Sequence, residues 1–209
     1  NKFKKISKTY NPKYSNLKSL AKRSDYISYT LGYEYGGIYM DMDIITKRNL
    51  LDLFNKLKKY NFIGFQHSAE IGDISVGFFL CRKNNIICKK LKECMDNHLN
   101  MFDKDQEIDI PWTKCASVDD IQKIIKTKVN KGYKYLGLDA NKYIYPIQWD
   151  KSNEYYWSKN KDISKAEKTK YAIYLHNAMY PQFIKKMNKN EVLNGDYRIS
   201  HILRKVLNK

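Results

Sequence analysis

The chain has 209 residues, of which 43% are apolar and 14% aromatic, so it can fold around a hydrophobic core and is not intrinsically disordered. Its formal net charge is +17, yet 34 of its 39 basic residues are Lys and only 5 are Arg. Because bidentate Arg side chains dominate base recognition, this balance argues against a protein that reads nucleic-acid sequence. We expect the Lys-rich surface to aid solubility or to attract anionic partners.

No apolar run approaches the roughly 18 residues that a membrane-spanning helix needs, so no transmembrane segment is predicted in this chain. Cys81, Cys88, Cys94 and Cys115 lack the spacing of a zinc site. They are expected to be free thiols in a reducing compartment, which predicts a cytoplasmic location. An anchor lost from an upstream segment remains the alternative.

Apolar and small residues recur at steps of three and four from 16 to 35, which predicts one long helix. Gly36 or Gly37 is placed to end that helix in the left-handed conformation. The β-branched and aromatic residues that follow predict a strand over 38–45.

Strands and helices alternate along the rest of the chain. We predict helices over 50–60, from the Asn84 or Asn85 cap to 99, from the Ser117 and Asp120 capping box to 130, and over 198–207. Strands are predicted over 62–65, 74–82, 133–138, 143–149 and 171–175. We expect a loop over 101–113 and a loop with a helical turn over 151–170. This alternation predicts an α/β fold with a mixed, mostly parallel sheet flanked by helices. No internal boundary is evident, so residues 1–209 are expected to form a single domain.

The strand predicted over 38–45 carries Asp41 and Asp43, two positions apart. Because side chains alternate across a strand, both carboxylates are expected on one face, at the strand's carboxyl end. Two carboxylates held close together repel unless a cation or a shared proton compensates. An Asp-x-Asp triplet is more often a solvated loop or a helix cap, but the glycine turn, the apolar strand and Tyr39 favour a ligand site here. Mg²⁺ or Mn²⁺ bound to a diphosphate would suit these oxygen ligands.

The dipeptide Ser24-Asp25 and the stretch YGGIYMDMD over 35–43 closely resemble the sugar-binding region containing DXD motif of glycosyltransferases. That group includes glycosyltransferase family 32, with yeast-type mannosyltransferases and bacterial capsule and lipopolysaccharide enzymes. It is similar to the catalytic domain of the clostridial glucosylating toxins. The resemblance is specific over this first stretch and continues more loosely to about residue 180.

The resemblance implies a GT-A-like, Rossmann-related domain and a retaining, metal-dependent transferase. Its donor would be a UDP- or GDP-sugar, and its acceptor a glycan, a lipid or a protein. By the same resemblance Asp25 contacts the donor sugar, Tyr39 packs on or bonds to the ribose, Asp41 binds the ribose and a metal-bound water, and Asp43 ligates Mn²⁺ or Mg²⁺. Asp25 as a plain helix-surface residue and Tyr39 as core packing are the simpler readings.

The chain departs from the family pattern at donor-binding positions. Ser28 stands where the family carries Arg, which removes a charged contact to the donor. The family's strand-end Asn falls near Ser75, in a stretch that ends at Gly77, and its His-Pro is replaced by Asn84-Asn85. We expect Ser28, Ser75 and Gly77 to lie at the substrate. The family's opening strand has no counterpart, so either the chain starts after that strand, as an N-terminally truncated domain, or the domain is degenerate.

The family's C-terminal His and Trp fall on Tyr174 and Tyr180 in an ungapped match. His176 lies two residues beyond Tyr174 and would supply the imidazole for metal or phosphate binding if the loop is shifted. A lone His at a strand end is more often structural, and both readings are kept.

Three other functions fit parts of the sequence. A catalytically impaired transferase-like domain would keep the fold but lose activity. A haloacid-dehalogenase-type phosphatase would use Asp41 as nucleophile and Asp43 as acid/base, but it needs a downstream lysine and a terminal acidic pair. A basic module that binds glycans or nucleic acid would need clustered Arg or exposed aromatic residues beside its charge.

Overall fold

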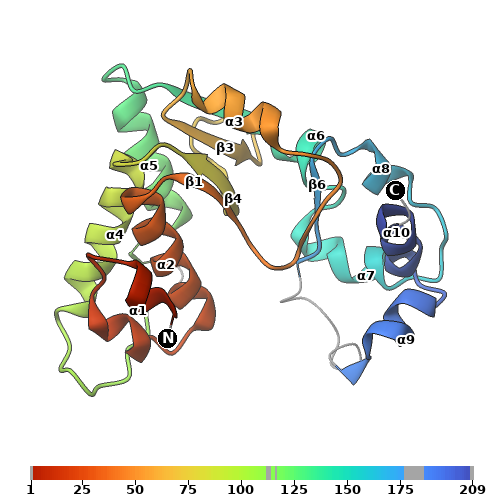
Figure 1. The fold of residues 1–209 in the computed structure, drawn as a ribbon, viewed down its shortest axis with the longest axis horizontal. Helices are drawn as coiled ribbons and strands as arrows, with labels where there is room; N and C mark the ends of the chain where they lie inside the picture. The colour runs from red at the N-terminus through yellow and green to blue at the C-terminus, as the bar shows by residue number, and fades with distance from the viewer. Residues whose placement is uncertain (1, 112–113, 116, 177–185, 208–209) are drawn as a thin grey trace. The chain divides into compact units, whose positions relative to one another are not determined.

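The computed structural model describes residues 2–111, 114–115, 117–176 and 186–207 (Figure 1). The chain forms two compact units, one made of residues 1–40 and 51–139, the other of residues 41–50 and 140–209. The expectation that residues 1–209 form a single domain stays a prediction.

The first unit is built on a four-stranded sheet in the order β1-β4-β3-β5. The strands are β1 (Gly37–Met40), β3 (Phe62–Gln66), β4 (Ile74–Cys81) and β5 (Tyr135–Asp139). Its helices are α1 (Lys2–Ile6), η1 (Pro12–Asn16), α2 (Leu20–Glu34), α3 (Leu51–Leu57), α4 (Ile86–Leu99) and α5 (Val118–Val129). Figure 1 shows α2, α4 and α5 on one side of this sheet and α3 on the other.

The α/β class, with a mixed sheet flanked by helices, is confirmed and is consistent with a GT-A-like fold. The expectation that the sheet is mostly parallel is wrong. Strand β4 pairs antiparallel with both β1 and β3, and only β3 with β5 is parallel. The short connection between β3 and β4 enforces antiparallel pairing, whereas α4 and α5 supply the long crossover that a parallel neighbour needs.

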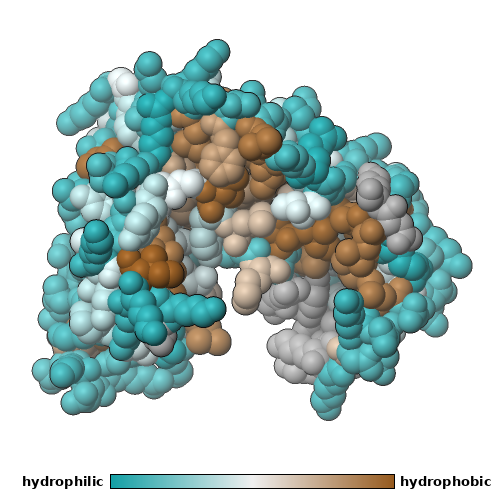
Figure 2. All heavy atoms as spheres, viewed as in Figure 1, coloured by the Kyte–Doolittle hydropathy of each residue, from teal (hydrophilic) through white to brown (hydrophobic). Residues whose placement is uncertain are grey.

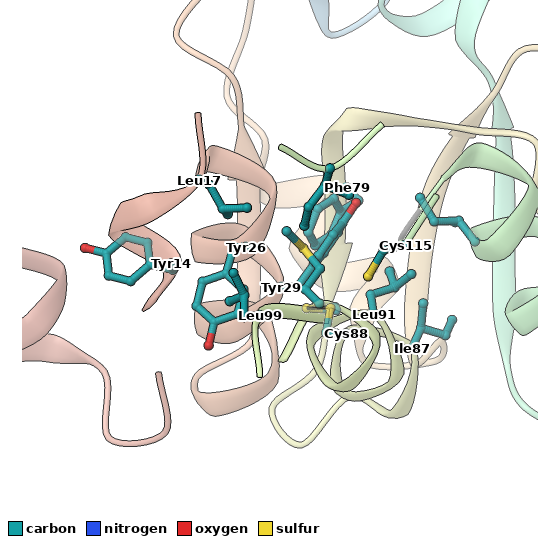
Figure 3. Close-up of a cluster of buried hydrophobic side chains, with 14 of the residues drawn as sticks. Tyr14, Leu17, Tyr26, Tyr29, Phe79, Ile87, Cys88, Leu91, Leu99 and Cys115 are labelled. Atoms are coloured by element: carbon teal, nitrogen blue, oxygen red, sulfur yellow. Dashed lines mark hydrogen bonds between the residues drawn. The ribbon is translucent and has the colours of Figure 1, made fainter. Parts of the chain in front are cut away.

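The core of the first unit lies where α2, β4 and α4 meet. Figure 3 shows side chains from these elements converging, among them Tyr29, Phe79 and Leu91. Tyr26 has no exposed surface, and its hydroxyl donates to Asp96 at 2.7 Å, so the polar end of a buried ring is satisfied. Apolar residues at helical spacing therefore fix α2 and α4 against the sheet.

The caps predicted for two helices are present. The Asn85 side chain accepts from the backbone N–H groups of Ile87 and Cys88, which begins α4. Ser117 and Asp120 form a reciprocal capping box at the start of α5. Both helices begin where the local sequence supplies acceptors for N–H groups that have no partner within the helix.

The single strand expected over 38–45 is wrong, because the chain forms two strands there. Strand β1 pairs with β4 in the first unit, while β2 (Ile44–Thr46) pairs antiparallel with β6 (Ala172–Tyr174) in the second. Residues 41–43 form the turn between them, where the Ile44 N–H donates to the Asp41 carbonyl at 3.3 Å. The two aspartates therefore lie in a turn just beyond the carboxyl end of β1.

The second unit contains β2, β6 and a set of short helices. These are α6 (Ala140–Tyr143), η2 (Trp149–Lys151), α7 (Ser152–Tyr156), α8 (Ser164–Lys168), α9 (Lys189–Asn194) and α10 (Arg198–Leu207). Helix α10 has the bounds that its apolar spacing predicts. The hydrophobic core of the second unit includes Tyr156, Ile173, Ile199 and Ile202.

One further expectation in this unit is wrong, and another is incomplete. The strand expected over 143–149 is absent, because the Ile144 and Tyr145 N–H groups both turn back to the Ala140 carbonyl, at 2.8 and 2.7 Å. The stretch 151–170, expected to be a loop with a helical turn, contains the two short helices α7 and α8. Short helices with few apolar residues are set by tertiary contacts more than by periodicity, so these segments gave a weak signal.

Hydrophilic side chains cover most of the face seen in Figure 2, as the charged fraction of 29% leads one to expect. Among the described helices, none combines the length and the apolar character that crossing a bilayer requires.

The end of α2 gives a test of the fold. Gly36 has φ +69°, and a Cβ there would lie 2.4 Å from the Lys83 backbone nitrogen. Gly37 has φ +110°, but a Cβ there meets no atom within 4 Å. We expect Gly36→Ala to lower the free energy of unfolding by roughly 2–5 kcal/mol, from backbone strain plus overpacking, and Gly37→Ala by about 1–2 kcal/mol from strain alone.

Urea denaturation of the two variants measures this difference. Equal destabilisation by both substitutions would contradict the close approach between the end of α2 and the backbone that follows β4.

Candidate functional site

The turn of residues 41–43 carries the two carboxylates predicted to form a site. Asp41 and Asp43 are half-buried and flank Met42, whose side chain is fully exposed. The Leu175 N–H donates to the Asp43 carbonyl at 2.9 Å, which extends the pairing of β2 with β6 by one bond. The backbone of the turn is therefore anchored to the end of β6.

Tyr174, the last residue of β6, holds Asp41 directly. Its hydroxyl donates to Oδ2 of Asp41 at 2.6 Å, a charge-assisted hydrogen bond. Its backbone N–H donates to the Ile144 carbonyl at 3.0 Å, and its carbonyl accepts from the Tyr156 hydroxyl at 2.7 Å. Tyr174 is thus fixed from two further segments, and it orients one oxygen of Asp41.

The electrostatics of Tyr174 keep it a neutral donor. Its pKa is raised well above the ordinary value of a tyrosine, first by burial, then by Tyr145 and by the charges of Asp41 and Asp43. The negative charges of both carboxylates therefore act on the same phenol and favour its protonated form. A protonated Tyr174 adds no further negative charge to the turn.

His176 lies next to this arrangement. Its ring stacks on Tyr145, with ring centres 4.8 Å apart and planes 7° apart, and lies 4.4 Å from the ring of Tyr174. Its φ of +55° is in the left-handed region, which is uncommon outside glycine. His176 is therefore one aromatic ring away from Asp41. Its metal-binding role stays a prediction.

The turn offers oxygen ligands of the kind that hard divalent ions take. Among the described residues no three His, Cys, Asp or Glu side chains gather as a ready-made cation site. Two carboxylates fit a Mg²⁺ or Mn²⁺ ion that completes its coordination with water and substrate phosphate oxygens. The carboxylate oxygens of Asp41 and Asp43 are thus the kind of ligand that the expected ion takes.

Three predicted substrate residues lie in the first unit, on α2 and β1. The Ser28 hydroxyl donates to the Asp25 carbonyl at 2.8 Å, so it is engaged within its own helix. The Tyr39 hydroxyl bonds to the Ser24 hydroxyl at 2.8 Å. Ser28 and Tyr39 line one cavity of about 310 Å³, together with Tyr35. The structure therefore brings Ser24, Ser28 and Tyr39 to neighbouring positions.

The remaining predicted positions lie on β4 or outside the described residues. Ser75 and Gly77 are both buried and stand two residues apart, so they face the same side of the sheet. Their contact with substrate stays a prediction. Tyr180, the position matched to the family's Trp, lies outside the described residues.

Sequence reasoning did not identify Tyr174 as the partner of Asp41. The one available signal was the ungapped match that placed Tyr174 on the family's C-terminal His. His176 is the alternative at that position because it supplies the imidazole that the family's His would provide. A hydrogen bond across 133 residues leaves no local pattern from which it could be deduced.

Comparison with known proteins supports the resemblance drawn from the motif. Residues 1–63 match the family model described as "Glycosyltransferase sugar-binding region containing DXD motif". This match covers Asp25, Tyr39, Asp41 and Asp43 and confirms the resemblance over these residues. Searches of curated proteins and of solved structures found no significant match. The match supports a glycosyltransferase, a class whose DXD regions generally bind a divalent metal.

The bond between Tyr174 and Asp41 predicts a pH effect on stability. Because the pKa of Tyr174 is raised in the folded state, the folded chain keeps a proton above about pH 10 that the unfolded chain releases. The free energy of unfolding therefore falls as pH rises above 10, by about 1.4 kcal/mol per pH unit for this group. Tyr174→Phe should make that slope shallower by the same amount.

At neutral pH, where the phenol is protonated in both states, Tyr174→Phe should cost roughly 1.5–3 kcal/mol for the lost bond to a carboxylate. Urea denaturation between pH 7 and pH 11 measures both effects. Asp41→Asn is the companion variant, because it keeps the phenol but removes a charge that raises its pKa. An unchanged slope in Tyr174→Phe would show that Tyr174 does not retain its proton.

Proposed function

We propose that this protein is a metal-dependent, retaining glycosyltransferase that uses a nucleotide-diphosphate sugar as donor. The observation that supports it most is the Asp41-x-Asp43 turn, within the matched region, with one oxygen of Asp41 held by the Tyr174 hydroxyl. In the reaction the bond from the sugar's anomeric carbon to the diphosphate breaks. A bond to an acceptor hydroxyl forms with the same anomeric configuration.

The aspartates would hold the ion and the diphosphate. Asp43 would ligate Mn²⁺ or Mg²⁺, and Asp41 would bind the donor ribose and a metal-bound water, as the family resemblance implies. When bound, such an ion stabilises the negative charge that develops on the departing diphosphate. Tyr174 is a positioning residue in this proposal. Its hydroxyl fixes the orientation of Asp41 before the donor arrives, which lowers the cost of ordering the site.

Further residues would bind the donor's sugar and ribose. Asp25 positions the sugar and Tyr39 packs on or bonds to the ribose, as the family resemblance implies. Ser28, Ser75 and Gly77 would lie near the donor without contributing charge. Since Ser28 replaces an arginine and its hydroxyl bonds within its helix, the diphosphate would depend on the metal ion for most of its charge compensation.

The proposed acceptor is a hydroxyl of a glycan, a lipid or a protein, and no specific nucleic acid is expected. A cytoplasmic location remains a prediction, supported by four cysteines that are all free thiols. The proposed hexosyl transfer would be a step in glycan assembly.

Donor hydrolysis tests the proposal. UDP- and GDP-sugars are incubated with the protein, with and without Mn²⁺ or Mg²⁺, and release of the nucleotide diphosphate is measured. We expect turnover only with the ion, and Asp43→Ala should lower it by at least about 100-fold, the usual scale for losing one stabilising group. Asp150→Ala, a change at an exposed aspartate of the same unit, is the matched control and should leave turnover unchanged.

Other outcomes point to the competing functions. Equal turnover without a metal ion, or in Asp43→Ala, would overturn the mechanism. Phosphate release from p-nitrophenyl phosphate would indicate a phosphatase that uses Asp41. Nucleotide-sugar binding without turnover would indicate an impaired domain, and salt-dependent binding of nucleic acid without nucleotide-sugar activity would indicate a basic binding module.

A further inference from the structure

A cavity in the second unit lies beside α7, outside every site that the sequence predicts. Its volume is about 340 Å³, at the lower end of the roughly 300–1,000 Å³ typical of small-molecule sites. Charged, hydroxyl and aromatic side chains line it, among them Lys151, Glu154, Tyr155, Ser158, Lys165 and Arg198. Its composition is therefore that of a polar ligand site and not of a packing defect.

Arg198, the first residue of α10, is the most informative group in this cavity. It is one of only five arginines in a chain with 34 lysines, and only 8% of its surface is exposed. The guanidinium lies 4.2 Å over the ring of Tyr155, and Nη1 donates to the Tyr155 carbonyl at 2.9 Å. Its buried Nε has no hydrogen-bond partner within the described part of the chain. A buried donor left in this state is costly unless a ligand or a rearrangement satisfies it.

The cavity's charges do not cancel. Lys151, Lys165 and Arg198 contribute three positive charges, and Glu154 contributes one negative charge. Asp162 also acts on Arg198, but its Oδ1 accepts from the Ser164 N–H at 2.9 Å, and no ion pair joins it to Arg198 among the described residues. The bond from Arg198 to the Tyr155 carbonyl already links α10 to α7. This link does not require the two lysines that also line the cavity.

We propose that this cavity binds the phosphate group of a phosphorylated substrate. A phosphate monoester carries a charge of about −1.5 to −2 at pH 7, which matches the surplus of the lining residues. Arg presents a planar set of donors suited to phosphate oxygens, and Lys supplies compact point charges beside it. Ser158 also lines the cavity, and its hydroxyl donates to the Tyr155 carbonyl at 3.1 Å.

Helix α7 connects this cavity to the aspartate turn. Tyr155 lines the cavity, and the hydroxyl of the next residue, Tyr156, donates to the carbonyl of Tyr174 at 2.7 Å. Tyr174 in turn holds Asp41. The next step rests on the proposed function. Under that function the phosphate in the cavity belongs to the acceptor, because the metal at the turn would bind the donor's diphosphate.

The test measures binding of glucose 6-phosphate by titration calorimetry in EDTA and about 150 mM salt. EDTA removes the ion that the aspartate turn needs, and salt screens the general attraction of a chain with net charge +17. We expect binding of glucose 6-phosphate and of inorganic phosphate but not of glucose. Lys151→Gln with Lys165→Gln should weaken it at least tenfold, about the effect of losing a charge-assisted bond.

Both lysines are exposed, so the double variant is expected to fold. It therefore tests phosphate binding even if a substitution of the buried Arg198, such as Arg198→Lys, prevents folding. Lys189→Gln, a change at an exposed lysine of the same unit, is the matched control and should bind like the wild type, as should Asp43→Ala. Binding that survives the double lysine substitution, or no phosphate binding at all, would overturn the proposal. Neither result bears on metal-dependent turnover, so the two proposals fail separately.

A second arm distinguishes the source of the phosphate. Vesicles of phosphatidylcholine with phosphatidic acid are compared with pure phosphatidylcholine vesicles in a flotation assay. Binding of glucose 6-phosphate assigns the cavity to a soluble sugar phosphate, and binding of phosphatidic acid vesicles alone assigns it to a lipid phosphate. In either arm the double lysine variant must lose the binding for the proposal to stand.

Discussion

The hydrogen bond from the Tyr174 hydroxyl to Asp41 joins the end of β6 to the turn that carries both aspartates. Together with the pairing of Ile44 with Tyr174, it determines where that turn lies in the second unit. Two carboxylates in one short turn would otherwise repel each other and move apart. A neutral phenol supplies a donor without adding charge, so it orients Asp41 without adding to the repulsion between the two carboxylates.

This arrangement explains how the chain keeps a DXD region although several family positions differ. In the ungapped match Tyr174 falls on the family's C-terminal His, with His176 as the alternative, and Tyr174 contacts the motif through its hydroxyl. Where the family carries an arginine, the chain has Ser28, whose hydroxyl bonds within α2. Ser28 thus offers no charge where the family has an arginine, while Asp41 and Asp43 both act on the Tyr174 phenol.

The helices and their ends could be predicted because their determinants are local. Asn85, Ser117 and the apolar spacing of 198–207 specify α4, α5 and α10 within a few residues of sequence. The strand division at 41–43 could not be predicted, since the apolar pattern runs through 38–45 and the break depends on which distant strands provide partners. In the same way the Asp pair could be predicted from its spacing, whereas the role of Tyr174 depends on a contact across 133 residues.

Equilibrium binding of Mn²⁺, followed by the electron paramagnetic resonance signal of the free ion, tests the central claim most directly. With UDP or GDP present, the account predicts one bound Mn²⁺ per chain, and this binding should be lost in Asp41→Asn and in Asp43→Asn. Binding of the ion with unchanged affinity in both variants would contradict the claim that the 41–43 turn is a metal–diphosphate site.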